Sequence, residues 1–91
     1  MHEIRYFLAL CEEGNFTRAA QRCDVAQPSL TKAIKSLELK LGGALFYRSK
    51  FETRLTTLGN LVKPLLNNIK REAERAHKVA QKFNAQSSMD V

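Results

Sequence analysis

Polar side chains recur at helical spacing in one short stretch of this 91-residue chain, and their chemistry suits contact with base edges. The stretch begins at Gln27, and its polar members lie at i, i+4, i+5, i+8 and i+9: Gln27, Thr31, Lys32, Lys35 and Ser36. A helix of about 3.6 residues per turn brings residues at this spacing to one side. Amide, hydroxyl and ammonium groups supply the donors, acceptors and positive charge that the major groove and the phosphates of DNA require.

An apolar stripe runs along the other side of the same stretch. Its members fall at i, i+3, i+4, i+7 and i+11: Leu30, Ala33, Ile34, Leu37 and Leu41. Pro28 suits the first turn of a helix, where its missing N–H costs nothing, and Gly42-Gly43 suits the end. The pattern predicts a helix over 27–41 that buries one face on its own domain and offers the other to a partner.

A shorter amphipathic helix is expected just before it. Asn15 or Thr17 can cap its free amide groups, and the small residues Ala19 and Ala20 let two helices cross closely. The turn at 24–26 would then join the two helices. The sequence thus predicts a helix-turn-helix over residues 16–35.

The flanking segments supply support for this unit. A stripe from Ile4 to Cys11 predicts a first helix over 4–12, with Leu10 off the stripe and expected to be partly exposed. Gly14 suits a left-handed position at its end. From Leu45 to Thr56 the chain is rich in aromatic and β-favouring residues, which indicates a two-stranded hairpin, the wing.

A long helix is predicted over about 57–83, because apolar residues recur every three or four positions. This seam comprises Leu58, Val62, Leu65, Ile69, Ala73, Ala76, Ala80 and Phe83. At ~1.5 Å per residue the helix would span about 40 Å, longer than so small a domain can cover. We therefore expect the seam to form a dimer interface with the same helix of a second chain. Pro64 is expected to remove one hydrogen bond and kink the helix.

Composition narrows the class of protein. The net charge is +6, and the segment 27–63 holds seven basic and two acidic residues, a balance of +5 that points to a polyanionic partner. The sequence has no apolar run long enough for a transmembrane span and no secretory signal pattern. Cys11 and Cys23 are expected to be reduced and buried. We predict no metal, no cofactor and no enzyme activity, since the sequence lacks a metal-ligand spacing, a nucleophile–base pair and a phosphate-binding glycine loop.

The order of these residues resembles the N-terminal domain of the LysR-type transcriptional regulators. The resemblance covers about residues 4–66, and the matching pieces are Tyr6-Phe7, Glu13 to Ala20, Gln27 to Lys32, Ile34, Leu37-Glu38, Leu41-Gly42, Leu45 to Arg48, Leu55-Thr56 and Gly59. It implies a bacterial, cytoplasmic, nucleoid-associated protein that reads partial inverted repeats as a dimer. It also implies contacts to bases or phosphates at Gln27, Pro28, Thr31 and Lys32. The sequence departs from the family at Ala26, where Ser is common, and at Phe51-Glu52, where Arg-Gly is common.

The predicted DNA contacts are Gln27, Pro28, Ser29, Thr31, Lys32, Lys35, Ser36, Arg48 and Lys50. Several have an alternative: Ser29 and Thr31 can serve the helix start, and Arg48 can instead hold the hairpin through Glu38.

The predicted fold is a mainly α winged helix-turn-helix over 1–57, with a linker and dimerisation helix over 58–83 and a disordered tail over 84–91. The expected function is sequence-specific binding of double-stranded promoter DNA by a homodimer, with half-sites about one turn (~10 bp) apart and no small-molecule effector on this chain. The alternative is a short interaction protein that pairs with full-length relatives and titrates them.

Overall fold

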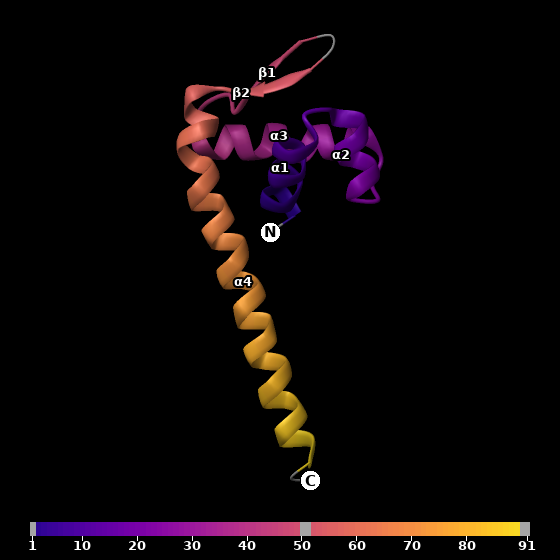
Figure 1. The fold of residues 1–91 in the computed structure, drawn as a ribbon, viewed down its shortest axis with the longest axis vertical. Helices are drawn as coiled ribbons and strands as arrows, with labels where there is room; N and C mark the ends of the chain where they lie inside the picture. The colour runs from indigo at the N-terminus through magenta and orange to yellow at the C-terminus, as the bar shows by residue number, and fades with distance from the viewer. Residues whose placement is uncertain (1, 50–51, 90–91) are drawn as a thin grey trace.

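Three short helices, a hairpin and one long helix make up the computed structural model, which describes residues 2–49 and 52–89. In chain order they are α1 (His2–Glu13), α2 (Phe16–Arg22), α3 (Gln27–Leu41), β1 (Phe46–Arg48), β2 (Thr53–Leu55) and α4 (Thr57–Met89). Helices α1 to α3 and the hairpin gather at one end, here called the head, and α4 runs away from it to the C-terminus (Figure 1). The predicted mainly helical winged architecture is confirmed.

The core lies where α1, α2 and α3 cross beneath the hairpin. Its largest side chains are fully buried: Phe7, Leu10, Leu30, Ile34 and Leu45. The expectation that Leu10 is partly exposed was wrong, because α1 packs against α2, α3 and α4 and so needs more than one apolar side. The rings of Phe7 and Phe46 lie 5.4 Å apart and join α1 to the hairpin.

The helix ends follow the predicted residue chemistry. Gly14 and Gly42 adopt left-handed backbone angles, with φ of 66° and 79°. The side chain of Asn15 caps α2 by accepting the backbone N–H of Arg18 at 2.9 Å. Ala26 precedes α3 without any side-chain cap, as its departure from the family pattern predicted.

The hairpin is antiparallel, with Phe46 opposite Leu55 and Arg48 opposite Thr53. Thr56 joins it to the long helix: its hydroxyl donates to the carbonyl of Ala44 at 2.7 Å and accepts the N–H of Gly59 at 3.0 Å. Its own N–H donates to the carbonyl of Leu45 at 2.9 Å. One buried threonine therefore caps α4 and fixes its starting point under the wing.

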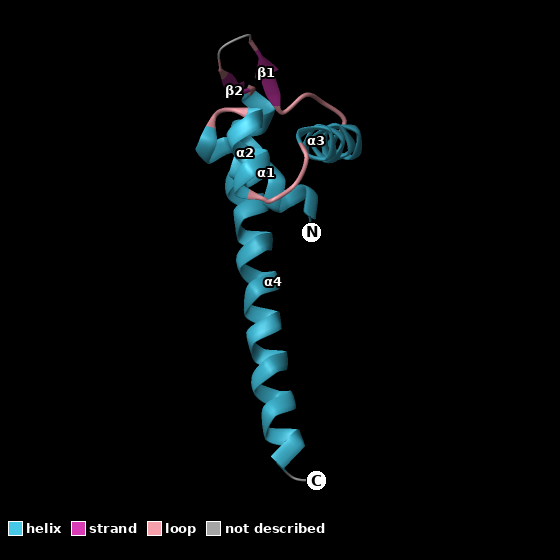
Figure 2. Ribbon diagram, turned by 90° about the vertical axis from the view of Figure 1, so that its right-hand side faces the viewer, coloured by secondary structure: helices cyan, strands magenta, loops and turns pink. Residues whose placement is uncertain are grey.

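Helix α4 is longer than predicted. It continues to Met89, so the expected tail over 84–91 is helical through residue 89, and residues 90–91 lie outside the described part of the chain. Pro64 lies inside this continuous helix, which Figure 2 shows standing below the head. Within residues 2–49 and 52–89, no helix is both long and apolar enough to cross a membrane.

Both cysteines are free thiols and half-buried. Burial raises the pKa of Cys11 from 9.0 to about 11, partly opposed by the nearby charge of Lys63, so this thiol stays protonated near neutral pH. Among the described residues, no group of His, Cys, Asp and Glu gathers at metal-binding distance.

Candidate nucleic-acid interface

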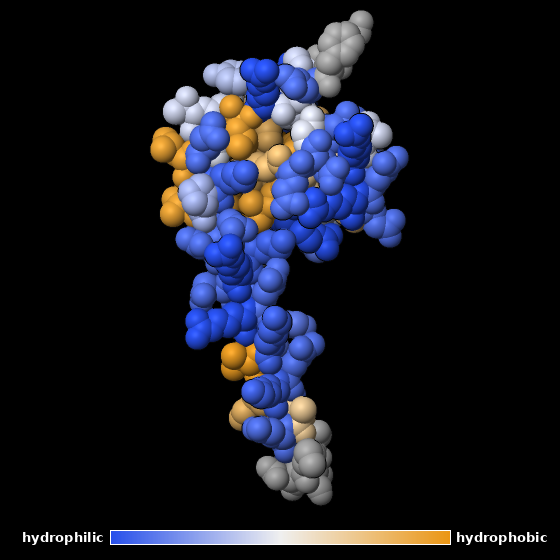
Figure 3. Space-filling model, in the orientation of Figure 1, coloured by the Kyte–Doolittle hydropathy of each residue, from blue (hydrophilic) through white to orange (hydrophobic). Residues whose placement is uncertain are grey.

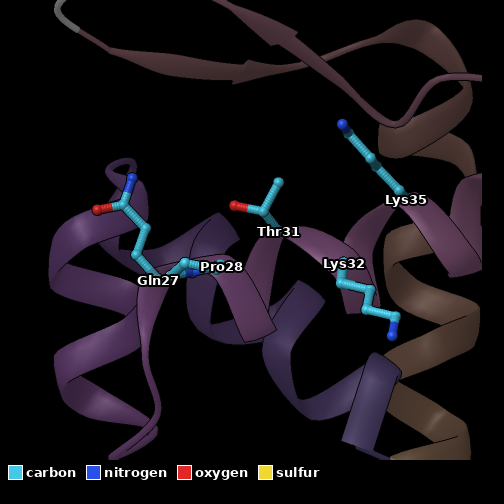
Figure 4. Close-up of a pocket in the computed structure, with 5 residues that line it drawn as sticks. All are labelled: Gln27, Pro28, Thr31, Lys32 and Lys35. Carbon is cyan, nitrogen blue, oxygen red and sulfur yellow. The ribbon is translucent and has the colours of Figure 1, made fainter.

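The outer face of α3 carries the predicted polar side chains. Four of them line one shallow hollow together with Pro28: Gln27, Thr31, Lys32 and Lys35. In Figure 4, Gln27, Thr31 and Lys35 extend toward the side on which the hairpin lies, whereas Lys32 extends the other way. The ammonium groups of Lys32 and Lys35 thus point to opposite sides of α3, and Thr31 lies between these lysines and Gln27 at the start of the helix. Positive charge on both sides of a helix that also carries an amide and a hydroxyl suits a groove between two phosphate backbones.

Exposure separates these residues into two sets. Gln27, Pro28, Ser29, Lys32 and Lys35 are exposed, whereas Thr31 and Ser36 are half-buried at the margin of the core. Solvent therefore reaches the first set freely, and the second set can offer only part of its surface to a partner.

The charges of Lys32 and Lys35 are not neutralised within the described chain, where neither forms an ion pair with a carboxylate. Lys40, on the same helix, is instead tied to Glu3 of α1 at 2.7 Å. The two lysines on the hollow are therefore available for phosphate or guanine, whereas the third serves helix packing.

The exposed side chain of Gln27 has a hydrogen-bond partner within the chain. Its side-chain oxygen accepts a hydrogen bond of 3.1 Å from the hydroxyl of Thr17, at the start of α2. Both residues are exposed, so this contact crosses the surface of the helix-turn-helix between the two helix beginnings. From the sequence Thr17 is predicted only as a possible cap, because a contact between residues ten positions apart depends on the tertiary turn.

Arg48 holds the base of the wing, which was the alternative predicted for it. Its guanidinium lies 3.6 Å from Oε1 of Glu38 and 5.3 Å from the ring centre of Phe16. The other carboxylate oxygen, Oε2, accepts the N–H of Leu45 at 2.7 Å. Glu38 therefore joins α3 to the first strand through both oxygens. A DNA contact by Arg48 stays a prediction, and Lys50 lies outside the described residues.

Replacement of Glu38 by alanine should loosen the wing. The change removes a charge-assisted hydrogen bond to the N–H of Leu45 and the partner of Arg48, and we expect it to cost about 1–2 kcal/mol in the free energy of unfolding. Urea unfolding would measure this cost, and amide exchange at Leu45 would show whether the wing opens locally.

Glu52→Ala provides the matched control for this carboxylate. The Glu52–Arg54 pair at 2.8 Å is exposed on both sides, so its removal should cost no more than about 0.5 kcal/mol. Equal effects of the two substitutions would contradict a structural role for Glu38.

The apolar seam of α4 divides into two parts. Leu58 and Val62 pack against the core of their own head, as does Leu66, so the structure explains them without a partner. The exposed large residues are Leu61 (66%), Leu65 (61%), Ile69 (46%), Val79 (62%) and Phe83 (66%). Ala76 and Ala80 are exposed beside them, and Ala73 is half-buried.

The exposed stripe is therefore turned slightly from the predicted seam. Leu61 and Val79 belong to it but were missed, each lying one residue before a predicted seam position. Orange surface appears over the start of α4 and again lower on the same helix in Figure 3, within mostly hydrophilic surroundings. An apolar stripe of this extent on a helix with few contacts to its own head is typical of an interface.

The order of helices and wing, with an outward basic face on the second helix of the helix-turn-helix, defines a winged helix-turn-helix unit. The model for bacterial regulatory helix-turn-helix proteins of the LysR family matches residues 1–60. The chain belongs to this family.

Similar proteins agree with this assignment. The chain is 34% identical over 85 residues to the HTH-type transcriptional regulator TfdT of Cupriavidus pinatubonensis, a match that covers 89% of this chain and 37% of TfdT. It is 44% identical over 57 residues to the HTH-type transcriptional regulator ClcR of Pseudomonas putida, covering 63% of this chain and 19% of ClcR. The chain thus spans well under half the length of these relatives.

Two solved DNA complexes have the same fold. The protein in the CbnR_DBD–DNA complex is 32% identical and superposes with a TM-score of 0.84, over 89% of this chain and 93% of that one. The protein in the complex of BenM_DBD with catB site 1 DNA is 28% identical with a TM-score of 0.83, over 90% and 92%. The neighbours therefore match the head and the long helix together.

Proposed function

We propose that this chain binds double-stranded promoter DNA in a sequence-specific manner, as the DNA-reading part of a bacterial transcriptional regulator in the cytoplasm, at the nucleoid. The observation that carries the proposal is the face of α3, where Gln27, Lys32 and Lys35 are exposed and the two lysines have no carboxylate partner in the described chain. A helix with this surface supplies base-reading groups and phosphate-binding charge together. The solved complexes of similar chains with DNA support the same role.

The proposed unit is a homodimer formed through α4. Leu65, Ile69 and Phe83 are exposed large apolar side chains on one stripe of this helix, and a second copy would cover them. A two-fold dimer places two copies of α3 in successive major grooves, so the bound sequence should be a partial inverted repeat with half-sites about 10 bp apart.

Selection of bound duplexes from a randomised DNA pool by the purified 91-residue protein tests this function. The expected result is enrichment of an inverted repeat with the stated spacing. Recovery of DNA without any enriched sequence would overturn sequence-specific binding. The apolar stripe of α4 would then be explained by the alternative function, in which the chain pairs with relatives and does not read DNA.

Lys32→Ala should weaken binding to the enriched sequence by about 1–3 kcal/mol if Lys32 contacts a base. The loss should be largest for the preferred sequence and smaller for unrelated DNA, because only a base contact discriminates. Fluorescence anisotropy titrations at several salt concentrations would measure both effects. A smaller salt slope with unchanged selectivity would instead assign Lys32 to a phosphate.

Lys40→Ala is the matched control, because it removes the same charge from the same helix at a position tied to Glu3. We expect it to leave sequence preference unchanged. Equal loss of preference in both variants would contradict the assignment of the reading face.

A further inference from the structure

The contact between Thr17 and Gln27 has a direction that bears on which bases Gln27 can read. The hydroxyl of Thr17 is the donor, and Oε1 of Gln27, 3.1 Å away, is the acceptor. Thr17 lies in the first turn of α2, whose beginning is capped by Asn15, and Gln27 begins α3. Helices α2 and α3 pack against each other through buried residues, which fixes the start of α2 relative to the start of α3. The contact between Thr17 and Gln27 therefore joins two fixed points of the helix-turn-helix.

This hydrogen bond makes the two ends of the Gln27 amide unequal. A glutamine amide has an oxygen that accepts and an NH2 group that donates twice. The bond from Thr17 uses one of the two lone pairs of this oxygen and turns the oxygen toward α2, so the NH2 group is the end of the amide that lies away from Thr17. Figure 4 shows the side chain of Gln27 at the start of α3, where it lines the hollow. The β-branched side chain of Thr17 has few rotamers, which helps to keep its hydroxyl in place.

The bases differ in what they offer such a donor. In the major groove guanine presents two acceptors, N7 and O6, and thymine presents one acceptor, O4. Adenine presents one acceptor, N7, and one donor, its N6 amino group. Reading adenine with both ends of a glutamine amide requires the oxygen to point at the base. A Gln27 amide whose oxygen is turned toward Thr17 is therefore suited to guanine or thymine.

We propose that Thr17 is a positioning residue that orients the amide of Gln27 with its NH2 group outward, so that this position of the site prefers a base presenting acceptors only. The proposal rests on the proposed DNA-binding function. It assigns no direct contact with DNA to Thr17, and its action passes wholly through Gln27.

Thr17→Val tests this role, because valine keeps the shape and removes the hydroxyl, while Thr17→Ser keeps the hydroxyl. Binding of each variant is measured to the selected duplex and to duplexes changed at single base pairs. In Thr17→Val the preference at the base contacted by Gln27 should fall roughly threefold to tenfold, as for the loss of one hydrogen bond, with adenine gaining most. Thr17→Ser should retain the preference, and the salt dependence should be the same in all three proteins.

The double variant with Gln27→Ala separates positioning from direct contact. If Thr17 acts through Gln27, Thr17→Val should have no further effect once Gln27 is alanine. A loss that persists in the Gln27→Ala background, or a smaller salt slope in Thr17→Val, would overturn the proposal by placing Thr17 on a phosphate.

The free protein provides a readout that does not depend on DNA. Nitrogen relaxation of the Gln27 side-chain amide should report a more mobile NH2 group in Thr17→Val than in Thr17→Ser, with the same thermal unfolding midpoint in both. An amide equally mobile in wild type and Thr17→Val would refute the positioning role. If the amide responds as expected but no sequence is enriched, the DNA-binding proposal fails while the contact itself stands.

Discussion

Gly59→Ala is expected to destabilise the head by about 2 kcal/mol, because α4 begins in direct contact with the backbone of the wing. A Cβ at this position would clash with the carbonyl oxygen of Leu45 and would lie 2.7 Å from a methyl of Leu55. The carbonyl of Leu45 cannot turn aside, since it accepts the N–H of Thr56 at 2.9 Å. Alanine's better helix propensity, worth up to about 1 kcal/mol, offsets only part of this cost. Urea unfolding followed by circular dichroism measures the difference.

Gly43→Ala is the matched control for this substitution. Its added Cβ would meet only a methyl of Leu58, at 2.9 Å, and the end of a leucine side chain can move. We expect a cost below about 1 kcal/mol. If Gly59→Ala unfolds at the same urea concentration as the wild type, the close approach of α4 to Leu45 is not present in solution.

Glutamate at both Leu65 and Ile69 should separate the proposed dimer. The two side chains are 61% and 46% exposed in the single chain, so charge there is harmless to the head but would be buried between two helices. The dissociation constant of the dimer should rise at least about a hundredfold, or about 2.8 kcal/mol. Sedimentation equilibrium measures the change, and binding to an inverted repeat should fall with it because the two half-sites are no longer engaged together.

Arg71→Gln with Lys78→Gln changes the net charge by the same amount on another side of α4. Both residues are exposed, and helical periodicity places them about half a turn from Ile69. This control variant should remain dimeric. Any loss of DNA affinity that it shows measures the effect of the changed net charge alone. A dimer that survives glutamate at the apolar stripe would place the interface elsewhere.

Local chemistry made most of the fold predictable. The left-handed glycines, the Asn15 cap and the apolar stripe of α3 are each decided by a few neighbouring residues, and the structure contains them, except that Leu41 at the end of the stripe is 40% exposed. The burial of Leu10 was not predictable in this way, since periodicity describes one apolar face and α1 is covered from several directions. The C-terminal end of α4 was missed because the apolar pattern stops at Phe83, whereas alanine and glutamine continue a helix without any apolar face.

The candidate site was predictable as a set of residues but not as a set of contacts. Spacing alone placed Gln27, Lys32 and Lys35 on one face. The bond from Thr17 to Gln27, and the stacking of Arg48 on Phe16, join residues that only the tertiary turn and the packed wing bring together. The stripe on α4 was displaced near the head for a related reason, since the head takes Leu58 and Val62 into its own core and leaves Leu61 outside. Val79 lies farther along α4, where the helix is exposed on every side.

The lower half of α4 has a consequence for how the protein responds to its own concentration. Residues 74–86 are exposed along their whole length, and a lone helix of about 12–15 residues is only marginally stable in water. In the proposed dimer, association would supply the free energy that the isolated segment lacks, and ordering of this half and pairing of two chains would be one coupled event. Helicity per residue should then rise with protein concentration. The concentration of the protein in the cell would set the fraction of molecules in which α4 is ordered and two half-sites can be bound together.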